Sequence, residues 1–137
     1  MSASTKLSST VKALCYLAKS YPEPKNSIEI SDQIGVNASK LRKILSMLVK
    51  NEIVSSTQGQ RGGFLIAKDT NKLHLQEIYC AIEDRKAFHL NVSKIHGNRK
   101  SETQNLNNFF LSLFDDIQVD IEEKMKKITL KSILDQI

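Results

Sequence analysis

The sequence predicts a mainly α-helical protein with one small β-hairpin and a long C-terminal helix. Apolar residues recur at steps of three and four in several segments, as they do on one face of an α-helix. Three of the five glycines lie in one short polar tip between two strand-like runs. A last apolar stripe continues for about six helical turns near the end of the sequence.

The first helix is expected over Ser4–Ser20, with Ser4 or Thr5 as its N-cap. The sequence Tyr-Pro-Glu-Pro at 21–24 ends it. Proline lacks a backbone N–H and forces the preceding residue out of the α region.

Two further helices follow, Ile28–Ile34 with Ser27 as its cap and a third over about Ser39–Asn51. Only the turn 35–38, which begins with Gly35, separates them. Two helices joined by so short a glycine-containing turn are typical of a helix-turn-helix.

A β-hairpin is expected next, with strands Ile53–Thr57 and Phe64–Lys68. Glycine tolerates the positive φ angles that tight turns need, which explains three glycines in the tip. The tip residues between them are Gln58, Gln60 and Arg61, which are polar or cationic. A hairpin of this kind directly after a helix-turn-helix predicts a winged helix-turn-helix, and DNA binding is the leading hypothesis. The tip is not a phosphate-binding P-loop, because no Gly-Lys-Ser/Thr follows it.

The rest of the sequence predicts a fourth helix at Leu73–Ile82 and then a flexible basic loop at 84–105. A long amphipathic helix follows at about Gln104–Ile128, and Thr129 opens a short terminal helix. We therefore expect a DNA-binding domain at 1–83 and a dimerisation segment at 106–137. The long stripe is too extensive for one small domain to cover, which favours self-association. The expected dimer interface is Leu106, Phe109, Phe110, Leu113, Ile117, Ile121 and Met125.

Positive charge is concentrated in the first half of the sequence. Residues 1–72 hold 11 Lys/Arg and 5 Asp/Glu, whereas residues 73–137 hold 9 and 10. This asymmetry is expected if the first half meets a polyanion. No apolar run approaches the roughly 20 residues that cross a bilayer, and the N-terminus lacks the apolar stretch of a secretory signal. We expect a cytoplasmic protein without a membrane partner.

The outward positions of the third helix are polar or cationic, and no Asp or Glu occurs between Asn37 and Asn51. A helix about 10–12 Å wide fits the major groove, where Arg and Lys can read the acceptor edge of guanine. Arg61 in the hairpin is placed to enter a narrow minor groove. The expected DNA-binding residues are Lys6, Asn37, Ser39, Lys40, Arg42, Lys43, Gln58, Gln60 and Arg61.

The sequence resembles the Rrf-two family of bacterial transcription regulators, the IscR/BadM/NsrR type. The resemblance rests on Thr5-Lys6, residues 35–58, the hairpin pattern from Ser56 to Lys68, the helix Leu75–Glu83 and the closing Ile128–Leu134. It implies a homodimer crossed through the long helix and bound to palindromic double-stranded DNA. It also implies operator contacts from the third helix and the hairpin, with Lys6 and its neighbours holding phosphate.

Two departures from the family pattern stand out. Gln58 replaces the arginine usual before the first glycine of the hairpin, so Arg61 is expected to take the minor-groove role. Members that bind an iron–sulfur cluster place three cysteines after the fourth helix, where residues 84–105 contain none. Clusters need thiolate ligands. We expect no cofactor and no metal site.

Several alternatives remain open from the sequence. The leading one is a winged-helix module that docks a protein partner such as a metabolic enzyme. RNA binding lacks the exposed aromatic platform that single strands usually need. Cys15 and Cys80 both fall on apolar helical faces, where buried structural thiols are expected and a redox role is the alternative. No catalytic constellation is present, so we expect a protein that is not an enzyme.

Overall fold

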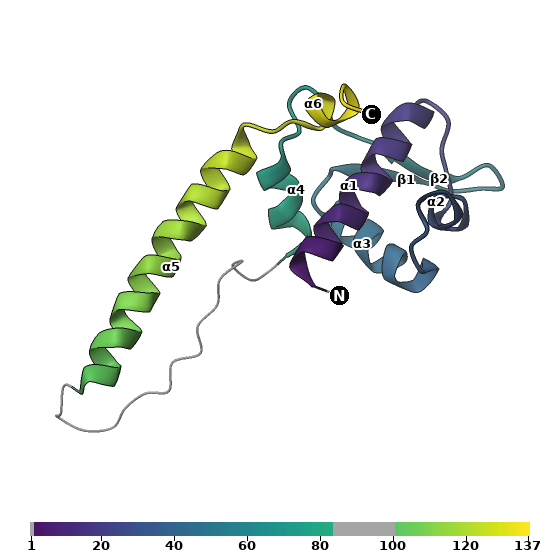
Figure 1. Cartoon of the computed structure of the whole chain (residues 1–137). Coiled ribbons are helices and arrows are strands. Elements are labelled where there is room, and N and C mark those ends of the chain that lie inside the picture. Colours follow the sequence, from purple (N-terminus) through teal and green to yellow (C-terminus); the bar gives the residue numbers. More distant parts are fainter. Residues whose placement is uncertain (1, 84–100) are drawn as a thin grey trace.

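The computed structural model describes residues 2–83 and 101–137. It contains six α-helices and one two-stranded antiparallel sheet within these ranges. Helices α1 to α4, the hairpin and α6 form one body, and α4 lies on the side of this body that faces the long helix α5 (Figure 1). The elements are α1 Ala3–Ser20, α2 Ser27–Ile34, α3 Ala38–Lys50, β1 Val54–Thr57, β2 Gly63–Ile66, α4 Leu75–Ile82, α5 Glu102–Lys126 and α6 Leu130–Leu134.

The predicted order of elements is confirmed, and the differences lie at their ends. Capping explains the starts of α1 and α2, because a side chain one to three residues earlier than expected accepts the first free N–H groups. Ser2 caps α1 in place of Ser4 or Thr5, and Asn26 caps α2 in place of Ser27. Asn26 also forms a reciprocal capping box with Glu29.

The fourth helix begins at Leu75 rather than Leu73, because the His74 side chain caps it and accepts the Glu77 N–H at 3.2 Å. Ser101 caps α5, which therefore starts at Glu102 and takes up the end of the segment expected to be a loop at 84–105. The rest of that loop prediction, residues 84–100, lies outside the described residues. Thr129 caps α6, as expected.

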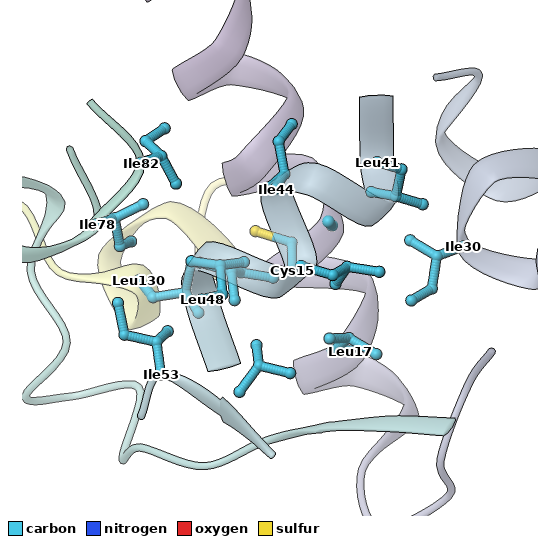
Figure 2. Close-up of a cluster of buried hydrophobic side chains, with 14 of the residues drawn as sticks. Cys15, Leu17, Ile30, Leu41, Ile44, Leu48, Ile53, Ile78, Ile82 and Leu130 are labelled. Atoms are coloured by element: carbon cyan, nitrogen blue, oxygen red, sulfur yellow. The ribbon is translucent and has the colours of Figure 1, made fainter. Parts of the chain in front are cut away.

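The hydrophobic core is built from α1, α2, α3, β1, α4 and α6. Figure 2 shows Cys15, Ile30, Ile44, Ile78 and Leu130 converging from five of these helices. The apolar stripes predicted for α3 and α4 supply their part of the core. Each fully buried leucine contributes about 1.5–3 kcal/mol of transfer free energy.

The terminal helix α6 packs against the N-terminal body, whereas the sequence predicted that it belongs to the dimerisation segment at 106–137. Leu130 is fully buried in the core, and Ile133 and Leu134 pack against it. Backbone hydrogen bonds hold this segment to the approach to α4: the Leu75 N–H donates to Ile128 and the Leu130 N–H donates to Leu73, both at 2.8 Å. We expected α6 to belong with the dimerisation segment, but it completes the N-terminal core.

Helix α5 is an arm that the body covers only in part. It contacts α4, and Gln118 is its one buried residue. Its first half carries Leu106, Phe109 and Phe110 on the surface, and Phe109 is 60% exposed. The predicted interface residues Leu113, Ile117, Ile121 and Met125 are half-buried. Across the described ranges, no helix is long and apolar enough to cross a membrane.

Candidate nucleic-acid interface

Helix α3 presents a polar face because its apolar residues are buried on the other side. Leu41, Ile44, Leu45 and Leu48 are at most 1% exposed and fix the rotation of the helix. The opposite face therefore points to solvent. Its exposed residues are Ser39, Lys40, Arg42, Lys43, Ser46 and, at the last position of the helix, Lys50.

Asn37 begins this helix as its N-cap. Its Oδ1 accepts the backbone N–H groups of Ser39 and Lys40, at 2.9 and 3.4 Å. The sequence interpretation treated Asn37 as a DNA contact and placed the start of the helix at Ser39. In the structure Asn37 positions the N-terminal turn that carries Ser39 and Lys40.

Three lysines from two helices line one hollow at this surface. Lys6 on α1 and Lys40 and Lys43 on α3 surround a hollow of about 310 Å³, which Ile44 and Met47 also line. None of the three forms a salt bridge within the described residues. Unpaired ammonium groups gathered in this way attract an anion such as a DNA phosphate.

The Arg42 side chain contacts α2, the first helix of the helix-turn-helix. Its Nε lies 3.5 Å from Ser27 Oγ, within the described residues it has no carboxylate partner, and its side chain is exposed. The sequence interpretation gave Ser27 only the role of a cap. The two residues lie fifteen positions apart, and a contact at this separation leaves no periodic signal in the sequence.

The hairpin is the wing of this fold and projects beyond the body (Figure 1). Strand β1 pairs with β2 in the register that places Val54 opposite Ile66. The tip residues Gln58, Gln60 and Arg61 are exposed. Backbone hydrogen bonds between Lys25 and Phe64, at 2.8 and 3.1 Å, attach β2 to the segment after α1. Each strand is one residue shorter than expected: β1 begins at Val54, and β2 runs from Gly63 to Ile66. The Ala67 N–H still donates to the Ile53 carbonyl at 2.9 Å just beyond the strand ends.

Only one of the three tip glycines has a positive φ. Gly59 has φ of 110°, as the sequence interpretation supposed for the whole tip. Gly62 and Gly63 are instead needed for close approach of the backbone. A Cβ on Gly62 would lie 2.5 Å from the Thr57 carbonyl oxygen, and one on Gly63 would lie 2.6 Å from the Lys25 backbone.

The two cysteines differ in their surroundings. Cys15 is 7% exposed, and burial raises the pKa of its thiol, although Lys19 opposes the shift. Cys80 is exposed, so the expectation of a buried structural thiol is wrong there. Its Sγ accepts a hydrogen bond from Gln76 Nε2 at 3.2 Å. The helical stripe places Cys80 beside the buried face of α4 rather than within it.

The described residues do not fit a metal site. They contain no group of three or more His, Cys, Asp or Glu side chains that could hold an ion. The whole sequence has two cysteines, which the structure places on separate helices. This donor set does not match an iron–sulfur cluster, which is usually held by four thiolates.

The structure combines a helix-turn-helix with a wing, and the exposed cations of α3 form no salt bridge within the described residues, an arrangement typical of DNA-binding regulators. The family model for the Rrf2 iron-dependent transcriptional regulators matches residues 3–136. The chain belongs to this family of bacterial transcription regulators.

Named relatives agree with this assignment. The HTH-type transcriptional regulator IscR of Escherichia coli is 36% identical over 56 residues, which are 41% of this chain. The match spans about a third of that relative's length, 35%. The structure of T. potens IscR superposes with a TM-score of 0.71 at 22% identity, covering 96% of this chain and 85% of its own. CymR, the global cysteine regulator of B. subtilis, gives 0.71 at 19% identity, covering 97% and 95%. These two structures share the fold.

Proposed function

We propose that this chain represses nearby genes by binding a palindromic operator as a homodimer. The observation that carries the proposal is the surface of α3, where Lys40, Arg42 and Lys43 have no carboxylate partner among the described residues. Arg42 and Lys43 would read guanine edges in the major groove. Lys6 would neutralise a phosphate. A cytoplasmic location follows from this proposal, because the operator is chromosomal.

The wing would extend the contact to the neighbouring minor groove. Arg61 is exposed in a tip without acidic residues, and narrow A·T-rich minor grooves attract such a side chain. Gln58 and Gln60 flank it and supply hydrogen-bonding groups. Its role would be to read groove width rather than base identity.

Dimerisation would occur through the exposed apolar side of α5. Phe109 and Phe110 pack edge to face with ring centroids 5.6 Å apart, and Phe110 and Phe114 are 5.8 Å apart. Contiguous exposed aromatic residues commonly mark a protein interface. A second copy covering them would link two α3 helices, and a palindromic operator matches such two-fold symmetry.

The test is DNA binding to the regulator's own upstream region and to genomic fragments. The triple variant Arg42→Ala/Lys43→Ala/Arg61→Ala should bind at least about 100-fold more weakly, because the contacts of Arg42 and Lys43 with base edges contribute about 1–3 kcal/mol each and the minor-groove contact of Arg61 is lost as well. The control Lys72→Ala/Lys124→Ala/Lys131→Ala removes the same charge from exposed sites outside this surface and should retain most affinity. Equal affinity of the two variants would overturn the proposal and favour a protein-docking module.

A further inference from the structure

A second hollow lies beside α1, and none of the lysines at the α3 surface lines it. It has a volume of about 460 Å³ and lies where α1, α2 and α6 meet. This volume is within the range of about 300–1,000 Å³ that is typical of small-molecule sites. The lining residues are Val11, Lys12, Cys15, Tyr16, Lys19, Gln33, Ile34, Ile133 and Ile137.

The lining is mainly apolar. Val11 and Cys15 come from α1, Ile34 from α2 and Ile133 from α6, so three elements each contribute apolar surface. Cys15 is buried, and its thiol stays protonated at neutral pH because burial raises its pKa. It therefore behaves as a small apolar group in this wall. These residues favour a ligand with a hydrocarbon portion.

The charged side chains of the lining are both positive. Lys12 and Lys19 lie two helical turns apart on α1, and both are exposed. No Asp or Glu lines the hollow, and neither lysine forms a salt bridge within the described part of the chain. An apolar surface bordered by two unpaired ammonium groups complements a molecule that is apolar at one end and anionic at the other.

We propose that this hollow binds a small amphipathic carboxylate. Its hydrocarbon chain would lie on Val11, Ile34 and Ile133, and its carboxylate would form charge-assisted hydrogen bonds with Lys12 and Lys19. The free energy of binding would come mainly from apolar burial, and the lysines would select the anion over a neutral or cationic molecule of the same length.

The position of the hollow gives such a ligand a regulatory role, and this step rests on the proposed function. Gln33 and Ile34 are the last lining residues before the turn at Gly35, which leads directly into α3. A ligand that contacts these two residues would shift the end of α2, and this shift would change the position of the α3 surface. It can change DNA affinity only by binding the DNA-competent arrangement with a different affinity from the free one.

The test uses the full chain and sodium octanoate as the probe, below its micellar concentration, with binding measured by calorimetry. Octanoate should bind, and octanol and octylamine should bind at least about tenfold more weakly. Lys12→Gln/Lys19→Gln should lose at least about tenfold in octanoate affinity. Lys72→Gln/Lys131→Gln, which changes two exposed lysines outside the hollow, should bind octanoate as the native chain does.

A further variant locates the site. Val11→Phe, which fills the hollow, should abolish octanoate binding. Octylamine binding as tightly as octanoate, or full affinity in the Lys12/Lys19 variant, would overturn the proposal. So would conversion of a dimer to monomer by Val11→Phe, which would make the hollow an interface between copies. Loss of DNA binding in the α3 variants leaves these results unaffected, so failures of the two proposals are distinguishable.

Discussion

Gly63 shows how one residue attaches the wing to the body. Its lack of a side chain lets β2 approach the Lys25 backbone, where the two Lys25–Phe64 hydrogen bonds form. A Cβ there would meet backbone atoms at 2.6 Å, and backbone atoms cannot move aside as a flexible side chain can. The residue is therefore a requirement of packing rather than of turn conformation.

Gly63→Ala should lower the free energy of unfolding by about 1–3 kcal/mol, because the wing must shift and strain or lose these hydrogen bonds. Denaturant unfolding followed by circular dichroism measures the change. Ser55→Ala, on the exposed side of β1, is the matched control and should alter stability by less than about 0.5 kcal/mol. Equal stability of the two variants would show that β2 can move without cost.

The cysteines should differ in reactivity as they do in exposure. Native protein at neutral pH should react with about one equivalent of a thiol reagent, at Cys80, because Cys15 is buried and its raised pKa keeps the thiolate scarce. Both should react in denaturant. Peptide mass spectrometry assigns the labelled residue, and preferential labelling of Cys15 in the native state would contradict this account.

At the scale of elements, the sequence predicted the kind and order of every helix and strand described. Buried stripes such as Leu41, Ile44 and Leu48 carry a strong periodic signal, and Gly35 and the prolines at 22 and 24 mark the breaks. Helix starts were less predictable, because neighbouring polar residues such as Asn26 and Ser27 can both serve as caps. The Arg42–Ser27 contact and the role of Gly63 depend on tertiary packing, which no local pattern encodes.

Helix α5 is the element through which we propose that two copies associate. Phe110→Asp/Ile117→Asp should convert the proposed dimer to monomer, because an unpaired charge buried in an apolar interface is costly. Operator affinity should fall with it, since the two half-site contacts would no longer be linked. Sedimentation measures the oligomeric state. Ser112→Asp adds a carboxylate at an exposed position of α5 and should leave the dimer intact; a double variant that stays dimeric would place the interface elsewhere.

For the whole molecule, the family description includes iron dependence, whereas the sequence has two cysteines and the residues that the structure describes hold no group of three or more possible metal ligands. Protein purified without oxygen should be colourless and should contain neither stoichiometric iron nor acid-labile sulfide. Visible absorbance and metal analysis test this directly. A brown protein that keeps its colour in chelator would contradict the prediction and would direct attention to His89 and His96.

The burial of Leu130 has a consequence for the order of events during synthesis. This residue fills the core of the DNA-binding body, yet it follows the whole of α5 along the chain. Emptying such a site typically costs about 2–5 kcal/mol, a large part of the stability of a small domain. A nascent chain can therefore finish its core only after α5 has left the ribosome. The arm that would recruit a second copy is therefore synthesised before the core beneath the proposed DNA-reading surface is complete.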